Sequence, residues 1–121
     1  MISQIVNFET AKLAKIKGYD WCDEKYNDYY YHHDGTLYFN PHQSGSRTAI
    51  APAQSMLQKW LREKHYVAVI VDIDMTLSWV WKIIPIDERC VIGKFSISKN
   101  VFCDKYESAL EDGLIEALKL L

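Results

Sequence analysis

The hydrophobic pattern of residues 52–121 changes its period twice, and this change restricts the fold more than any other feature of the sequence. Residues 52–65 carry apolar side chains at helical spacing, residues 66–98 alternate in three segments, and residues 104–121 return to the helical period. Sequential strands with short links most simply form an antiparallel meander. The sequence therefore predicts an α+β fold, in which a three-stranded antiparallel sheet is covered by two helices in the order α-β-β-β-α.

The three predicted strands span residues 66–74, 77–84 and 90–98. Period two places alternate side chains on opposite faces of the sheet. In the second strand, Trp79 and Trp81 share one face, and Val80 and Lys82 share the other. The pattern alone leaves open which of these faces is buried.

The last helix shows the clearest periodicity in the chain. Asp104 and Glu107 resemble a capping box at its start. Its acidic residues are expected on the outer surface: Glu107, Glu111, Asp112 and Glu116. Small residues recur at four-residue spacing at Ala109, Gly113 and Ala117, which predicts close approach of another backbone.

An N-terminal helix and a β-hairpin precede this core. Asn7 is a suitable N-cap and Gly18 a suitable C-terminal residue for the helix, whose expected apolar side is Phe8, Ala11, Leu13 and Ile16. In the stretch YYYHHDGTLYF, residues 29–39, the Asp-Gly pair predicts a two-residue type I′ turn. That turn pairs His33 with Thr36, and it places Tyr31 and Tyr38 together on one face.

Residues 40–51 are predicted to form a loop, and Pro52 is expected in the first turn of the next helix. A chain of 121 residues fits a single domain, 1–121. Within it we distinguish an N-terminal helix and hairpin subunit, 1–50, from the α-β-β-β-α core, 51–121.

Composition and charge narrow the class of function. The net charge is −2, so no general basic field attracts nucleic acid or anionic membrane. The first residues lack a signal-peptide pattern, and no apolar run is long enough to span a membrane. Three cysteines without CxxC spacing favour reduced thiols, so a cytoplasmic protein is expected.

The sequence gives weak support to metal or catalytic chemistry. The group of Cys22, Asp23, His32, His33 and His42 lacks the close ligand spacing typical of zinc sites. Asp72 and Asp74 are better explained as polar residues on the open face of a sheet than as Mg²⁺ ligands. Acidic neighbours oppose thiolate formation at Cys22 and Cys103, and Cys90 is expected to be packed. We therefore predict no catalytic residue, metal, cofactor or small-molecule substrate.

Aromatic side chains are the candidate partner surface. Tyr31 and Tyr38 are expected to be exposed on the hairpin, and a contiguous exposed aromatic patch would mark a binding site. Trp79 and Trp81 are either core residues, the favoured interpretation, or an exposed platform. The expected function is interaction with another protein or self-association, without enzymatic activity.

Three segments resemble a family of short uncharacterised proteins encoded by bacteriophages and prophages of gut anaerobes: FETAKLAKIKGY, APAQSMLQKWLREKH and YESALEDGLIEALKLL. The resemblance covers both ends and the middle of the chain. It implies a genomic context and no particular activity.

The order α-β-β-β-α with an alanine-rich last helix resembles the double-stranded-RNA-binding domain. That family has a lysine cluster at the start of its last helix, where this chain offers Lys105 among acidic residues. An acidic turn opposes phosphate contact. A nucleic-acid-binding accessory protein that uses Lys59, Arg62 and Lys64 is therefore the alternative function, and a disfavoured one.

Overall fold

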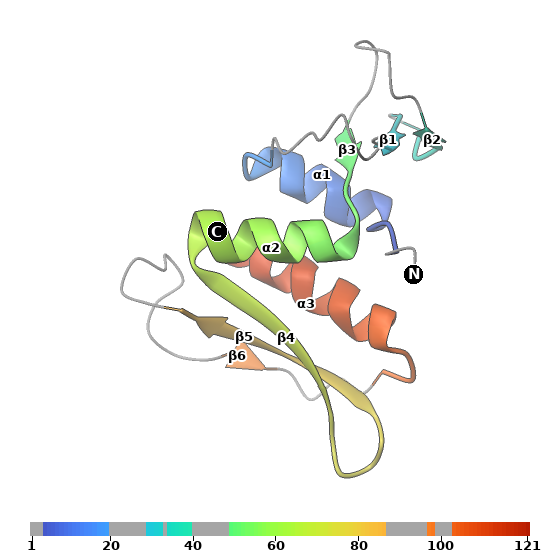
Figure 1. Ribbon diagram of the computed structural model, residues 1–121. Helices are drawn as coiled ribbons and strands as arrows, with labels where there is room; N and C mark the ends of the chain where they lie inside the picture. Colours follow the sequence, from blue (N-terminus) through green and yellow to red (C-terminus); the bar gives the residue numbers. More distant parts are fainter. Residues whose placement is uncertain (1–3, 20–28, 33, 40–48, 87–96, 99–102) are drawn as a thin grey trace.

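The computed structural model describes residues 4–19, 29–32, 34–39, 49–86, 97–98 and 103–121 (Figure 1). The described residues contain three helices and two small antiparallel sheets, so the predicted α+β class is confirmed. The elements in chain order are α1 (Phe8–Ile16), β1 (Tyr29–Tyr31), β2 (Leu37–Phe39), β3 (Ala49–Ala51), α2 (Gln54–His65), β4 (Val67–Ile73), β5 (Trp79–Pro85), β6 (Ile97–Ser98) and α3 (Tyr106–Leu120).

The larger sheet is built around the long hairpin of β4 and β5. Its two strands pair antiparallel from Val67↔Pro85 to Ile73↔Trp79. The described part of β6 pairs with β5 in the strand order β4-β5-β6. Most of the predicted third strand, 90–98, lies outside the described residues.

One face of this sheet is buried beneath α2 and α3 (Figure 1). Val67 and Val69 of β4 and Trp81 and Ile83 of β5 point into the core that these helices share. Ile70, Asp72 and Lys82 lie on the opposite, exposed face. The structure thus resolves the question of the buried face that the sequence pattern left open.

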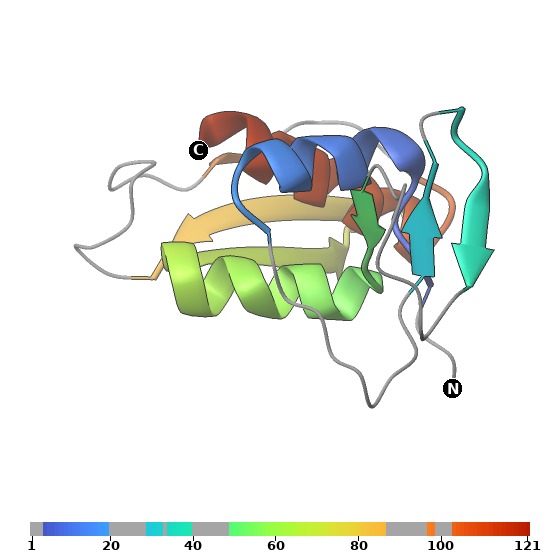
Figure 2. The ribbon, with the colours of Figure 1, turned by 90° about the horizontal axis from the view of Figure 1, so that it is seen from above.

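The three helices run side by side with their carboxyl ends at the same side of the molecule (Figure 2). The last turn of each carries basic residues: Lys15 in α1, Arg62, Lys64 and His65 in α2, and Lys119 in α3. Cations at a helix C-terminus are favourable because the backbone dipole is negative there. These side chains therefore complement the negative ends of the three helix dipoles at one side of the molecule.

Helix α1 begins as the sequence predicts but buries a different face. The Asn7 side chain accepts a hydrogen bond from the Thr10 N–H at 2.9 Å, and Gly18 takes a φ of +98° after the helix. Thr10, Ala11 and Ala14 are buried, whereas Ile16 is exposed, so the predicted apolar side is wrong. Small side chains allow α1 to lie close to α3, and Thr10 bonds directly to that helix.

A polar network centred on Glu111 of α3 ties the helices together. Its carboxylate accepts hydrogen bonds from the Asn7 N–H at 3.1 Å, from the Gln54 side-chain amide at 3.0 Å and from the Thr10 hydroxyl. Thr10 and Gln54 are both buried. The prediction that Glu111 covers the outside of the last helix is therefore wrong, because it serves as the acceptor for buried donors of α1 and α2.

The second sheet, in strand order β2-β1-β3, includes residues predicted to be a loop. β3 pairs antiparallel with β1, with Tyr30 opposite Ile50. A strand of three residues is too short to show an alternation of apolar and polar side chains. Only its pairing with β1 therefore identifies β3 as a strand. The core cluster includes Tyr31 as well as Leu57 and Leu114, so residues on both sides of position 50 share one core.

The hairpin of β1 and β2 is shifted by one residue from the predicted register. The His32 N–H bonds to the Thr36 carbonyl at 3.0 Å, and the Gly35 N–H bonds to the His32 carbonyl at 2.9 Å. Gly35 takes a positive φ and Asp34 does not, which excludes a type I′ turn. A three-residue loop results, and Tyr31 pairs with Leu37 instead of Tyr38. A shift of one residue moves side chains to the opposite face, so the predicted Tyr31–Tyr38 patch is wrong.

The starts of the other two helices also differ from the expected ones. Pro52 precedes α2, and its carbonyl accepts the Val6 N–H at 3.0 Å, while Ala53 is the N-cap. The N-cap of α3 is Lys105, without a side-chain cap hydrogen bond, so the capping box is wrong. Both helices are held by packing of their apolar faces rather than by N-terminal side-chain caps.

Candidate interaction site

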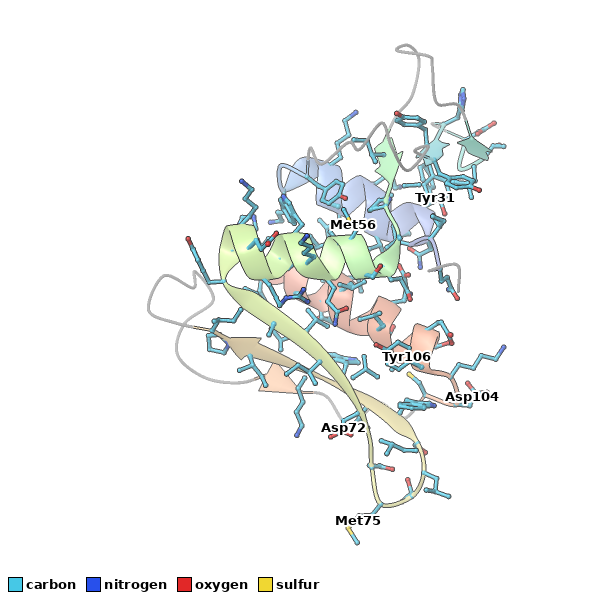
Figure 3. All side chains as sticks on the ribbon, in the orientation of Figure 1. Tyr31, Met56, Asp72, Met75, Asp104 and Tyr106 are labelled. Atoms are coloured by element: carbon cyan, nitrogen blue, oxygen red, sulfur yellow. The ribbon has the colours of Figure 1, made fainter. Side chains whose placement is uncertain are left out.

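The tip of the β4–β5 hairpin extends beyond the helices that cover the sheet (Figure 1). Met75 lies at the end of this hairpin and points away from the rest of the molecule (Figure 3). The Asp74 N–H bonds to the Ser78 carbonyl at 2.9 Å, and the Leu77 N–H bonds to the Asp74 carbonyl at 3.0 Å. The loop therefore consists of residues 75–77, with Leu77 in the left-handed region at a φ of +63°.

The side chain of Asp74 holds this loop in one conformation. Its Oδ1 accepts hydrogen bonds from the Thr76 N–H at 2.9 Å, the Thr76 hydroxyl at 2.7 Å and the Ser78 N–H at 3.1 Å. These bonds, that of the Thr76 hydroxyl first, lower the pKa of Asp74 because they favour the charged carboxylate. The tip is thus a preorganised loop that presents its side chains in a defined geometry.

The β1–β2 turn has the same hydrogen-bond pattern and offers an internal comparison. In that turn, residue 35 occupies the position that Leu77 occupies in the tip, and it is glycine. Glycine adopts a positive φ without steric cost, whereas another residue in that conformation costs about 1–2 kcal/mol. The chain therefore keeps an unfavourable residue at the tip while it has the favourable one in the equivalent turn.

The strained residue is also apolar and exposed. The exposed fraction of Leu77 is 79%, that of Ile73 is 46%, and Met75 is fully exposed. These three side chains, which we call the apolar tip, lie outside the hydrophobic core cluster. Backbone strain at an exposed apolar side chain is the combination expected where a contact with another molecule compensates for the cost.

The aromatic residues predicted to form a partner surface lie elsewhere. Tyr31 is buried, its hydroxyl donates to the Val6 carbonyl at 2.7 Å, and its ring lies 5.3 Å from that of Phe8. Trp81 is 1% exposed in the sheet core. Both are core residues, so their assignment to a binding surface is wrong, whereas the favoured interpretation of Trp81 as a core residue is confirmed. The position of the Tyr38 side chain lies outside what the structure describes.

Trp79 is half-buried at the base of the hairpin. Its ring contacts that of Tyr106 edge-on, with 5.4 Å between centroids, and Tyr106 is exposed (Figure 3). The Trp79 and Cys103 backbones exchange two hydrogen bonds, of 2.8 and 3.0 Å. Trp79 thus joins the hairpin to the start of α3. Because Trp81 is buried, the two tryptophans do not form the exposed platform that was the alternative to core residues.

Cys103 is unsuited to nucleophilic chemistry. Burial, Asp112 and Asp104 raise the pKa of its thiol, and its Sγ lies 4.0 Å from the Asp112 carboxylate. We expect iodoacetamide at pH 7.5 to modify Cys103 more slowly than the thiol of an unstructured peptide, because less thiolate is present. Peptide mass spectrometry after timed alkylation measures this rate separately from those of Cys22 and Cys90. Faster modification than that of the peptide would contradict the assignment.

The described residues contain no group of three or more His, Cys, Asp and Glu side chains arranged to hold a metal ion. Asp72 is exposed on β4, while the Asp74 Oδ1 is used in the turn. Four residues of the other predicted group, Cys22, Asp23, His33 and His42, lie outside the described residues.

The basic residues of the alternative function do reach the surface. Lys59, Arg62 and Lys64 are exposed on α2, and Lys105 is exposed at the start of α3 beside Asp104. Glu63 lies among the α2 cations. Within the described residues, this patch offers charge but no aromatic surface on which bases could stack. Trp81 is buried in the core, and Trp79 packs against Tyr106.

Comparisons with known proteins found no family model, curated protein or solved structure that matches the chain. Within the ranges that the structure describes, none of the helices has the length and apolar character needed to cross a membrane.

Sequence reasoning missed the apolar tip. The stretch from Asp74 to Ser78 reads DMTLS, and it contains neither glycine nor the residue pairs that usually mark a tight hairpin. The alternation of the two strands indicates a turn near Met75, but it does not indicate which loop residue takes a positive φ.

Proposed function

We propose that this protein is a small non-enzymatic interaction protein that binds a protein partner through the apolar tip of its β4–β5 hairpin. The observation that carries the proposal is Leu77, which is strained, apolar and exposed in a loop whose equivalent in the same chain uses glycine. The resemblance to phage and prophage proteins makes a bacterial host or phage protein the first partner to seek.

The chemistry of the tip defines the partner surface that it fits. Three apolar side chains on a narrow loop suit an apolar pocket, since buried anchors contribute most of the binding energy in protein interfaces. Asp72 and Asp74 lie directly behind the tip, and a carboxylate is repelled by the anionic surface of a membrane. A protein pocket with basic residues at its rim is therefore the proposed receptor.

Leu77→Gly is expected to stabilise the fold while it weakens partner binding. Glycine relieves the left-handed strain, but it also has greater backbone entropy in the unfolded chain. The difference between these two effects predicts a free energy of unfolding that is higher by about 0.5 kcal/mol. Thermal unfolding measures it as an increase in Tm of about 2 °C. The matched control is Leu77→Ala, which removes the apolar side chain but keeps the positive φ. An equal gain in Leu77→Ala would show that the backbone strain is not the cause.

Site-specific crosslinking tests the proposal directly. A benzophenone amino acid replaces Met75 in the expressed protein, and the control carries it in place of Ile16, an exposed apolar residue of α1. We expect a discrete crosslinked protein from position 75 that is absent from position 16. The purified captured protein should then bind Met75→Ser or Leu77→Gly at least about tenfold more weakly than the unmodified chain. Unchanged affinity in both variants would overturn the proposal.

The same binding measurement separates a protein partner from nucleic acid. An apolar pocket predicts weak dependence of affinity on salt, because few counterions are released. Binding through Lys59, Arg62 and Lys64 predicts a steep loss of affinity with salt and a raised 260/280 nm absorbance ratio in the purified protein. That result would favour the nucleic-acid alternative.

A further inference from the structure

The apolar tip contains one side chain whose chemistry differs from that of the other two. Ile73 and Leu77 carry hydrocarbon side chains, whereas Met75 carries a thioether sulfur. Met75 is fully exposed and points away from the rest of the molecule (Figure 3). Peroxides oxidise a methionine sulfur that they can reach, so the sulfur of Met75 is open to this reaction.

Met56 provides a comparison within the same chain. It lies on α2 and is half-buried, so the fold shields part of its side chain (Figure 3). The side chain of Met75 has no such protection. The third methionine, Met1, lies outside the described residues. The structure therefore predicts that a peroxide oxidises Met75 before it oxidises Met56.

The conformation of the loop does not depend on the side chain of Met75. Asp74 Oδ1 holds the loop through the Thr76 N–H, the Thr76 hydroxyl and the Ser78 N–H. None of these hydrogen bonds involves the thioether. An oxygen atom added to the fully exposed sulfur stays in water, so it changes neither the core nor these bonds. Oxidation of Met75 therefore changes the surface of the tip and leaves the fold as it is.

We propose that Met75 is a site of reversible oxidation that regulates binding through the apolar tip. In the forward step, a lone pair of the thioether sulfur attacks one oxygen of hydrogen peroxide. The O–O bond breaks as the S–O bond forms, the sulfur loses two electrons, and the second oxygen leaves as water. In the reverse step, two thiols of a methionine sulfoxide reductase are oxidised to a disulfide, and the oxygen of the sulfoxide leaves as water.

The regulatory effect rests on the proposed function, in which the tip enters an apolar pocket of a protein partner. Methionine sulfoxide is polar, whereas the thioether is apolar. Transfer of a polar group from water into an apolar pocket is unfavourable unless the pocket supplies a hydrogen bond. Oxidation of Met75 should therefore weaken partner binding, and reduction should restore it.

The first test needs no partner. The full chain is treated with dilute hydrogen peroxide, either folded or in concentrated urea, and is then digested with trypsin. Met56 and Met75 fall in different tryptic peptides, 48–59 and 65–82, and fragmentation locates the added oxygen. We expect faster oxidation of Met75 than of Met56 in the folded chain and similar rates in urea. Equal rates in the folded chain would overturn the proposal.

The second test measures binding to the protein captured by the crosslink at position 75. We expect the oxidised chain to bind at least about tenfold more weakly, with an unchanged Tm, and the reductase to restore the affinity. Met75→Leu keeps an apolar side chain that peroxide does not oxidise, so its affinity should survive the treatment. The matched control Met56→Leu should lose affinity as the unmodified chain does. Weaker binding of peroxide-treated Met75→Leu would assign the effect to another residue and overturn the proposal.

The oxidation site and the tip proposal fail by different results. If Met75→Ser weakens binding but the oxidised chain binds normally, the tip remains the binding site and its regulation by oxidation is rejected. If Met75→Ser and Leu77→Gly both bind normally, the tip itself is rejected as the binding site, and the regulatory role of Met75 is rejected with it.

Discussion

Replacement of Glu111 by alanine is expected to lower the free energy of unfolding by about 2 kcal/mol, because it removes one acceptor from each of two buried donor groups, the Thr10 hydroxyl and the Gln54 amide. The carboxylate accepts hydrogen bonds from Asn7, Thr10 and Gln54. Thr10 and Gln54 are buried, so water does not readily replace the lost partner. The loss is partial, because the Thr10 hydroxyl keeps Asn7 Oδ1 and the Gln54 amide keeps the Glu107 carbonyl as an acceptor. Urea denaturation followed by tryptophan fluorescence measures the change.

Two further variants separate the network from general effects of charge removal. Glu111→Gln keeps the shape but turns an NH2 group toward at least one of the donors, so we expect a loss more than half as large as that of Glu111→Ala. Glu116→Ala removes a carboxylate of the same helix that pairs with Lys119 at the surface, and it should cost less than about 0.5 kcal/mol. Equal losses in Glu111→Ala and Glu116→Ala would contradict a structural role for the network.

Gly113→Ala is the second substitution with a large expected effect. We expect it to destabilise the protein, although alanine has a higher helix propensity than glycine. A Cβ at position 113 would lie 2.8 Å from Val69 Cγ1 and 3.1 Å from Trp81 Cβ. Alanine gains about 1 kcal/mol of helix propensity over glycine, but overpacking of a buried contact costs about 1–3 kcal/mol. We expect the free energy of unfolding to decrease by about 1 kcal/mol, which urea denaturation measures as a lower midpoint concentration.

Val69→Ala in combination with Gly113→Ala shows whether contact with the sheet is the cause. Val69→Ala removes the methyl group nearest to the new Cβ, so the two substitutions should be less destabilising together than the sum of their separate effects. Strict additivity would show that another contact limits position 113. A stabilised Gly113→Ala would show that α3 moves away from the sheet at little cost.

The fold class was predictable because three long segments of the chain carry strong periodicity. The buried faces of α2 and α3 follow from that periodicity, whereas it does not decide which face of β4 and β5 is buried. Close contact at Gly113 was anticipated from the spacing of small residues, although it is made with sheet side chains and not with another backbone. Errors arose where local patterns are short. One loop residue decides the register of β1 and β2, and β3 has a partner strand but no pattern of its own.

The candidate site was less predictable for a physical reason. Burial of Tyr31 depends on a hydrogen bond to Val6, and inward placement of Glu111 depends on donors from helices distant in sequence. Tertiary contacts of this kind leave no periodic signal. The apolar tip was not predicted because the strain at Leu77 comes from its positive φ, and the residue type does not indicate this backbone angle.

The Glu111 network also has a consequence for the order of folding. It joins residues that are 104 positions apart in the chain, whereas α2 and β4 meet through Gln58 and Val69, which are 11 positions apart. Short-range contacts form faster because they close smaller loops. During synthesis, α2 and the β4–β5 hairpin can therefore assemble first. Helix α1 cannot form its contacts with α3 until the last helix has been synthesised. Slow translation before position 111 would prolong the exposure of α1, and chaperone binding should be strongest in that interval.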